Sequence, residues 1–347
     1  MKSLKQLYQE AYKETFTPPH KQYARNQSID LIKIIAMYGV LAIHSAQFQY
    51  IHYFYGCMAI PLFFMVTGYL QLGREKVSIT YCPSKITRIL RFSLIFLTLV
   101  WLFYGFILHS EVISLKSLLL FWFNSFLCRG GYSVFWFLGA LIIIYLFLPI
   151  LNKWYINNFK LFIIFSSSCI FIMTLVFIEY LIHYKYGWFS EQKLPQTLRF
   201  YNYFGYFCLG GLIKKGHFKN LGNLPLVCFM LVVNYIFQEW FQAYSDGNHG
   251  DCFYCTLPLI ILCISIFQFC IKLNIKNSNI IREFSKLFIP IYVLHMLILQ
   301  ITSRWVLFLG LPQLSEKIVN FLVLAIVVTV VSWVLMKFKV FQKFFSI

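Results

Sequence analysis

The chain is built from apolar stretches, each close to the roughly 20 residues that an α-helix needs to cross a membrane. Ten can be delimited, at about 28–48, 51–72, 88–108, 134–152, 159–182, 197–213, 221–242, 253–271, 284–305 and 318–337. Hydrophobic residues make up 60% of the 347 residues, and only 12% are charged. A water-soluble domain has too little interior to bury so much apolar surface. The sequence therefore predicts an all-α, polytopic membrane protein with about ten transmembrane helices.

The basic residues indicate how these helices are oriented. If the ten segments alternate in direction, 23 of the 30 Lys and Arg residues fall on the side of the two termini and 7 on the other side. Loops rich in Lys and Arg stay in the cytoplasm. We therefore expect a cytoplasmic segment 1–27, a membrane domain 28–337 and a cytoplasmic tail 338–347. The same rule accounts for the net charge of +18, so no nucleic-acid partner is expected.

One interval between apolar segments is too long for a turn and too polar to span comfortably. Residues 109–133 contain the sequence LKSLLLFWFNSFL, in which leucine and aromatic residues are interleaved with polar ones. Such a helix favours the boundary between lipid and water. We expect an interfacial or re-entrant helix here, on the outer side of the membrane.

The first apolar stretch carries two side chains that are costly in lipid, Lys33 and His44. They are eleven residues apart, so on a helix they lie almost on one face, with a rise of about 16 Å between them. An ionisable group at membrane depth needs a partner or a function. His44 is therefore either a structural hydrogen-bond partner or a functional group. His295, inside the ninth stretch, presents the same two alternatives.

A basic cluster, Lys85, Arg88 and Arg91, stands at the cytoplasmic entry to the third stretch. On a helix these three residues share a sector about 120° wide. Cations that close repel one another unless an anion joins them. The anion is either a lipid headgroup or the phosphates of a cofactor, because arginine forks match phosphate oxygens.

Several other residues have ordinary packing as their simplest explanation. Pro61 can interrupt a helix inside the membrane, and Thr67 with Gly68 allows two helices to approach closely. Trp136 opens the fourth stretch. The spacing of His249, Cys252 and Cys255 lacks an evident fourth ligand, so no metal is expected.

Taken together, these motifs resemble the acyltransferase-3 family of bacterial integral-membrane acyltransferases over most of the chain. The resemblance rests on Asp30 and on the family's Arg/Lys-x10-His pattern, met by Lys33 and His44. It continues in Pro61 to Leu70, the basic entry to the third stretch, Trp136 to Leu138, Phe207 with Gly211, and Tyr292 with His295. Two departures stand out: a lysine replaces the family's usual arginine at Lys33, and Arg91 stands where the family often has proline.

The resemblance implies a membrane O-acyltransferase of the bacterial cytoplasmic (inner) membrane. Members usually move acetyl from acetyl-CoA onto a sugar hydroxyl of a surface polysaccharide, such as O-antigen, capsule or exopolysaccharide, or of its lipid-linked precursor. Acetyl-CoA is then a substrate, no cofactor is tightly bound, and the partners are the acyl-CoA, the glycan acceptor and membrane lipids.

The resemblance also suggests residue roles. His44 would act as general base, and Lys33, about 16 Å from it along the same helix face, is the second catalytic candidate. Lys85, Arg88 and Arg91 would bind the phosphates of CoA. The further candidates are Asp30, Thr67, Gly68, Trp136 and His295.

Two other classes of function remain open at this stage. A transporter of polysaccharide or lipid-linked glycan without acyl transfer also fits ten helices that contain intramembrane histidines and prolines. A receptor or scaffold without chemistry fits as well. Labelled acetyl-CoA separates them, because only an acyltransferase transfers the label to a surface glycan.

The charge distribution makes a testable prediction about topology. Residues 74–88 and 272–286 should face the cytoplasm, and 183–196 and 243–251 should face outward. Single cysteines at Ser78 or Asn277, in a variant that lacks the ten native cysteines, should react with a membrane-impermeant maleimide only after the membrane is opened. Labelling of either position in intact cells would contradict this orientation.

Overall fold

The computed structural model describes residues 26–46, 51–75, 77, 81–109, 111–186, 194–244, 252–276 and 278–345. Within these residues every regular element is a helix. Seven helices are long and apolar enough to cross a membrane. They are α2 (Gln27–Ala46), α5 (Tyr81–Phe106), α7 (Trp136–Asn157), α8 (Phe159–Tyr186), α10 (Leu224–Tyr244), α13 (Phe288–Phe308) and α14 (Gln313–Leu335). The prediction of an all-α protein with membrane-spanning helices is confirmed, while the orientation of the termini stays a prediction.

Three of the ten predicted spans form shorter helices than expected. These are α4 (Ala59–Gln71), α9 (Phe200–Lys214) and α11 (Leu257–Lys272), with 13, 15 and 16 residues. At about 1.5 Å per residue they reach roughly 20–24 Å, less than the hydrocarbon core of about 30 Å. Most of their residues are buried, so they fill the interior of the bundle. The predicted number of about ten spanning helices is therefore not confirmed.

A 3-10 turn precedes each of these short helices. The turns are η1 (Gly56–Met58), η4 (Gln196–Leu198) and η6 (Cys252–Cys255). The second predicted span is thus interrupted before Pro61, not at it. Pro61 is the third residue of α4, where the missing N–H has no helical partner to lose.

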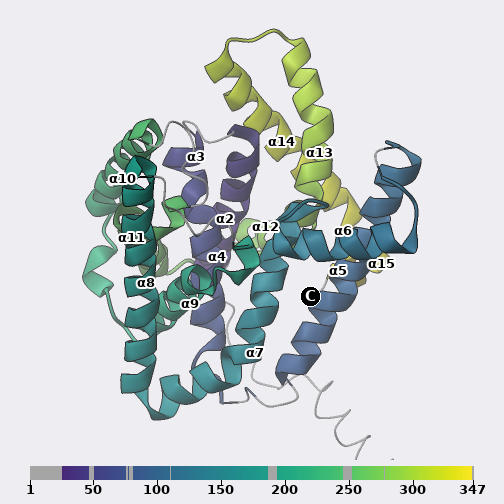
Figure 1. Cartoon of the computed structure of the whole chain (residues 1–347). Helices are drawn as coiled ribbons and strands as arrows, with labels where there is room; N and C mark the ends of the chain where they lie inside the picture. The colour runs from purple at the N-terminus through teal and green to yellow at the C-terminus, as the bar shows by residue number, and fades with distance from the viewer. Residues whose placement is uncertain are drawn as a thin grey trace, which may run out of the picture.

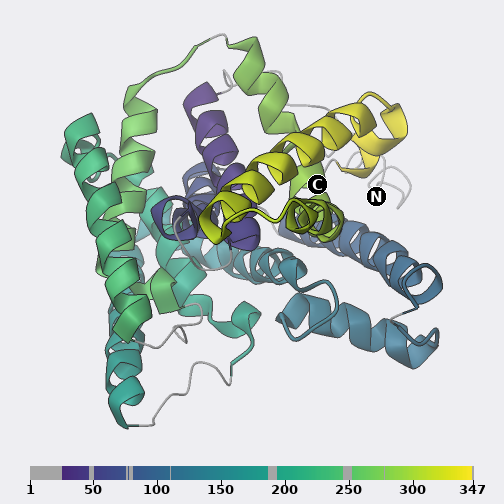
Figure 2. The ribbon, with the colours of Figure 1, turned by 90° about the horizontal axis from the view of Figure 1, so that it is seen from above.

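The helix α2 lies among the other described helices. Viewed from above, α2 has neighbouring helices on several sides (Figure 2). It contacts α4, α11, α13, α14 and the short amphipathic helix α12 (Asn279–Lys286). Two hydrogen bonds tie its start to the segment before α12: Ile275 N–H donates to Ser28 Oγ (3.2 Å), and Ser278 N–H donates to Gln27 Oε1 (2.6 Å).

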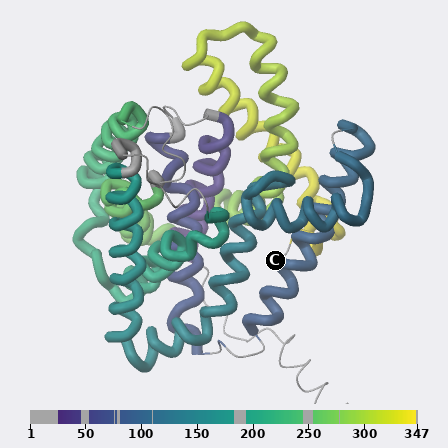
Figure 3. The backbone as a smooth tube through the Cα atoms, in the orientation of Figure 1, coloured from purple at the N-terminus to yellow at the C-terminus, as the bar shows by residue number. Residues whose placement is uncertain are grey.

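The remaining helices complete the outline. The helix α6 (Leu115–Leu127) lies across its neighbours (Figure 1), in keeping with a segment that does not span. The α13–α14 hairpin rises beyond the rest of the bundle (Figure 3). Two further short helices among the described residues are α3 (Ile51–Phe54) and α15 (Lys339–Phe344). The predicted segment 1–27 lies almost wholly outside the described residues, as do His249, Ser78 and Asn277.

The two innermost short helices, α4 and α9, cross in backbone contact. A Cβ atom built on Gly68 would overlap the carbonyl oxygen of Phe207, and one built on Gly210 would overlap that of Met65. Only glycine allows so close a crossing. Gly68, one of the candidate site residues from the sequence, therefore has a packing role.

This crossing predicts a large cost for a single methyl group. Gly68→Ala and Gly210→Ala should each lower the free energy of unfolding in detergent by about 3 kcal/mol, because the backbones must separate. Gly310→Ala is the control, since a Cβ there meets nothing within 4 Å and only its positive φ is strained. Equal thermal stability of Gly68→Ala and Gly310→Ala would show that the crossing is not tight.

Candidate active site

A cavity of about 380 Å³ lies between α2, α4, α5, α7, α12 and the start of α13. Its polar lining consists of Lys33, Thr67, Gln71, Lys85, Tyr145 and Ser285. Its apolar lining consists of Phe63, Val66, Leu70, Ile89, Phe137, Leu138, Leu141, Phe288 and Ile289. Because two lysines and no carboxylate line it, we call this space the basic cavity.

Lys33 reaches the basic cavity with a carboxylate behind it. Its Nζ lies 3.3 Å from Asp30 Oδ1, one helical turn earlier. The Asp30 side chain is 3% exposed and that of Lys33 is 28% exposed. Asp30 therefore holds the lysine in place from the protein side, and Lys33 directs its charge to the cavity.

Lys85 lines the cavity from α5 and has no carboxylate partner in the part of the chain that the structure describes. The nearby Glu283, on α12, pairs with Lys286 at 2.8 Å and with Arg282 at 3.5 Å. The hydrogen bond from Lys286 lowers the pKa of Glu283, so this carboxylate stays ionised in its own surface cluster. Lys85 is thus a cation that faces a cavity without a counter-ion.

The predicted basic cluster on α5 is divided by the helix. Lys85 and Ile89, one turn apart, line the cavity. Arg88 and Arg91 are exposed and are not among the lining residues, because successive positions at this spacing turn progressively away from Lys85. The two arginines therefore lie on the surface beside the cavity.

Sequence reasoning missed three polar lining residues: Gln71, Tyr145 and Ser285. Gln71 Oε1 accepts a hydrogen bond from Tyr81 (2.9 Å), and its Nε2 donates to the Tyr145 hydroxyl (3.4 Å). Of these three residues, only Gln71 has a signal in the sequence, because it is a polar residue at the end of an apolar run. Thr67, which was predicted, lines the cavity while its hydroxyl donates to the Phe63 carbonyl at 2.9 Å.

The two intramembrane histidines meet. The ring centroids of His44 on α2 and His295 on α13 are 5.0 Å apart, with 39° between the ring planes. His44 is half-buried and His295 is fully buried. His295 Nδ1 lies 2.6 Å from the carbonyl oxygen of Tyr292. The structure thus brings together two candidates that are 251 positions apart in the sequence.

An aromatic layer separates the histidine pair from the basic cavity. Phe63, Phe137 and Phe288 line the cavity, and Phe63 packs against Phe288 at 4.6 Å between centroids. Behind them the Tyr292 ring contacts Phe137 (5.5 Å), Phe288 (6.1 Å) and His295 (6.1 Å). Lys33 lines the basic cavity and His44 does not, although they lie on one helix.

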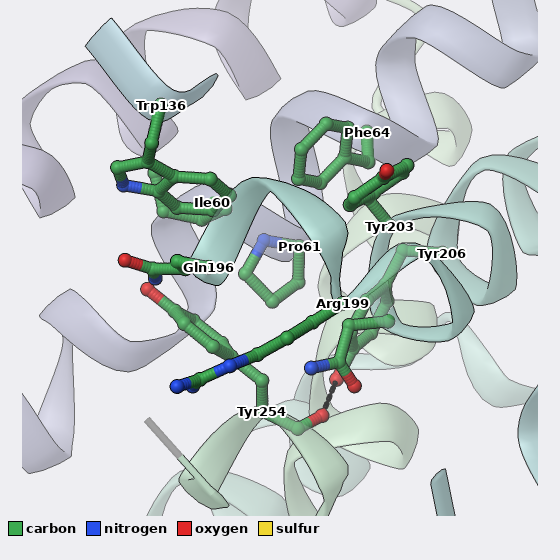
Figure 4. Close-up of a pocket in the computed structure, with 10 residues that line it drawn as sticks. Ile60, Pro61, Phe64, Trp136, Gln196, Arg199, Tyr203, Tyr206 and Tyr254 are labelled. Atoms are coloured by element: carbon green, nitrogen blue, oxygen red, sulfur yellow. Dashed lines mark hydrogen bonds between the residues drawn. The ribbon is translucent and has the colours of Figure 1, made fainter. Parts of the chain in front are cut away.

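Trp136 lines a different and much smaller space. Its other lining residues are Ile60, Pro61, Phe64, Gln196, Arg199, Asn202, Tyr203, Tyr206 and Tyr254 (Figure 4). The volume is about 20 Å³, room for about one water molecule. Trp136 still touches the aromatic layer, since its ring lies 6.4 Å from that of Phe137.

Comparison with known proteins places this arrangement in a family. A family model described as an acyltransferase domain matches residues 26–337. The amino-acid racemase of Enterococcus faecalis is 25% identical over an alignment 346 positions long, which covers 91% of this chain and 46% of that protein. The chain therefore spans about half the length of this curated relative. No solved structure matches the chain.

The family match includes both the basic cavity and the histidine pair, since every one of their residues lies between 26 and 337. It also agrees with a bundle of apolar helices that can cross a membrane. The chain therefore belongs to the acyltransferase-3 family of membrane acyltransferases.

Proposed function

We propose that the protein is an O-acyltransferase that moves acetyl from acetyl-CoA onto a sugar hydroxyl. The acceptor is a cell-surface polysaccharide or its lipid-linked precursor, and the reaction takes place in the bacterial cytoplasmic (inner) membrane. The observation that carries the proposal is the basic cavity beside a histidine pair, with Lys33 and His44 on the same helix. Family membership supplies the class of reaction.

The basic cavity suits the donor. Lys33 and Lys85 supply two cations for phosphate oxygens, with which ammonium groups form charge-assisted hydrogen bonds. The volume of about 380 Å³ falls within the usual range of about 300–1,000 Å³ for small-molecule sites. The apolar lining suits an extended pantetheine arm. Arg88 and Arg91, exposed beside the cavity, would hold phosphates of the nucleotide portion outside it.

The histidine pair suits the chemical step. Neutral His44 takes the proton of the sugar hydroxyl while that oxygen attacks the thioester carbonyl carbon. The carbon–sulfur bond then breaks, and the proton passes from His44 to the departing thiolate, which leaves as CoA. A general base of this kind typically contributes about 10²–10⁴ in rate. The thioester reaches His44 only if the Phe63 and Phe288 rings of the aromatic layer move apart.

One structural feature favours a second candidate, the transporter of lipid-linked glycan. The short interior helices α4, α9 and α11 stop within the thickness of the bundle, and interrupted helices build the substrate sites of many carriers. The name of the racemase relative adds no activity here, because the chain covers less than half of that protein.

The proposed function is tested by following the acyl group. Membranes that contain the protein are incubated with acetyl-CoA labelled in the acetyl group, and the surface glycan is analysed by mass spectrometry. The proposal predicts label in O-ester linkage that is absent from membranes without the protein. A transporter would leave the glycan unlabelled in both samples.

The role of His44 makes the sharpest mutational prediction. His44→Ala should reduce acyl transfer by about 10²–10⁴ and leave the amount of protein in the membrane nearly normal, because alanine costs less than histidine in lipid. His295→Ala should cause a smaller loss. The measurement is the initial rate per folded protein. A folded His44→Ala protein with a substantial fraction of the parent rate would exclude His44 as the base.

The cations predict a change in donor affinity. Lys85→Ala should raise the KM for acetyl-CoA at least tenfold, since a hydrogen bond to a charged group is worth about 1.5–3 kcal/mol. The double variant Arg88→Ala, Arg91→Ala should raise it as well. The matched control is Lys339→Ala, an exposed lysine on α15. If the variants lose expression while the surviving protein keeps its KM, the cluster instead binds lipid headgroups.

A further inference from the structure

His295 uses one of its ring nitrogens and leaves the other without a partner. Its Nδ1 lies 2.6 Å from the Tyr292 carbonyl oxygen. Its Nε2 is buried and has no hydrogen-bond partner among the described residues. A carbonyl oxygen can only accept, so the hydrogen belongs on Nδ1. In the neutral ring the free lone pair is then on Nε2.

The backbone around His295 is fastened to the segment before α7. The Tyr292 hydroxyl donates to the carbonyl of Val134, and the Tyr132 hydroxyl donates to the carbonyl of Val293 at 2.7 Å. All of these groups are buried. Turning the His295 ring away would break its own bond to Tyr292, so its orientation is set before any substrate arrives.

A buried acceptor without a donor costs about 1–3 kcal/mol, and native proteins keep few of them. The ring that faces His295 is that of His44, 5.0 Å away between centroids. His44 is also the more accessible of the two, being half-buried where His295 is fully buried. A substrate can therefore reach His44, and the lone pair of His295 lies on the buried side of His44.

We propose that His295 is a positioning residue for His44, an inference that rests on the proposed function. A small turn of the His44 ring, which is 5.0 Å from that of His295 between centroids, lets His295 Nε2 accept the N–H of His44 before any substrate binds. This hydrogen bond selects one His44 tautomer, the one whose free lone pair lies on the nitrogen turned away from His295. That nitrogen receives the hydroxyl proton, and His295 stabilises the imidazolium until the proton passes to the thiolate of CoA. His295 itself neither gains nor loses a proton.

The test compares two replacements of similar size. His295→Gln keeps an acceptor oxygen within reach of His44, whereas His295→Leu removes the acceptor. His295→Leu should lower kcat for acetyl transfer about 10²-fold with little change in the KM for acetyl-CoA. His295→Gln should recover at least tenfold of that loss. If the two variants lose kcat equally, or if His295→Leu keeps the parent kcat, the inference is wrong.

A second readout needs no activity. The protein is labelled with ¹⁵N in histidine, and the His44 and His295 signals are assigned by the loss of each signal in its variant. The inference predicts a single tautomer for His44 in the parent and in His295→Gln, and a mixture of two tautomers in His295→Leu. An unchanged His44 signal in His295→Leu overturns it.

The two readouts separate this inference from the proposed function. A parent protein that transfers no acetyl group defeats the proposed function, and the ¹⁵N signals then decide whether His295 controls the His44 tautomer. Transfer by the parent with no effect of His295 on kcat or tautomer defeats the positioning role alone. Variants that only lower the amount of folded protein, at an unchanged rate per folded molecule, also defeat it.

Discussion

The organisation of this protein depends on the backbone contact between α4 and α9. Because Gly68 and Gly210 have no side chains, the two helices pack as one unit in the middle of the bundle. One side of α4 then carries Phe63, Val66 and Thr67 to the basic cavity. Another side carries Ile60, Pro61 and Phe64 to the small space beside Trp136. A shift of this crossing would displace both linings together.

A second constraint is the cost of charge and unpaired polar atoms away from water. The two ends of α2 compensate this cost in different ways. Near its start, Asp30 holds Lys33 at the wall of the basic cavity, where Lys33 and Lys85 are the two cations that can attract an anion. Near its end, no carboxylate is paired with either histidine in the described chain, and His295 relies on a backbone carbonyl. In the proposed reaction His44 is the member of the pair that takes the proton, and His295 stays neutral.

In the proposed reaction, the aromatic layer determines that the donor enters the basic cavity before it meets His44. Phe63, Phe137, Phe288 and Tyr292 stand between the cavity and the histidines. In the proposed reaction, water from the cavity does not reach His44 until the donor has entered and the rings have separated. Such exclusion protects a thioester from hydrolysis.

Much of this could be predicted from local sequence. The length of the apolar stretches located the seven helices that are long and apolar enough to span, and the polar interval at 109–133 located α6. Hydropathy reports directly on helices that face lipid. Hydropathy overestimated the lengths of α4, α9 and α11, because a helix buried in protein is as apolar as a helix that spans the membrane. The division of Lys85 from Arg88 and Arg91 could not be predicted either, because it depends on where α5 packs. The contact of His44 with His295 depends on the whole fold.

The central claim of the proposed function is that acetyl-CoA enters the basic cavity from the side predicted to be cytoplasmic and that the acetyl group is transferred to a glycan on the opposite side. The most direct measurement uses proteoliposomes of known orientation that enclose oligosaccharides released from the surface glycan of cells lacking the protein. Labelled acetyl-CoA is added outside. The account predicts label on the enclosed sugar only when residues 74–88, predicted to be cytoplasmic, are on the side of the added acetyl-CoA. Label that appears only in vesicles of the opposite orientation, or only when both substrates are on the same side, would contradict it.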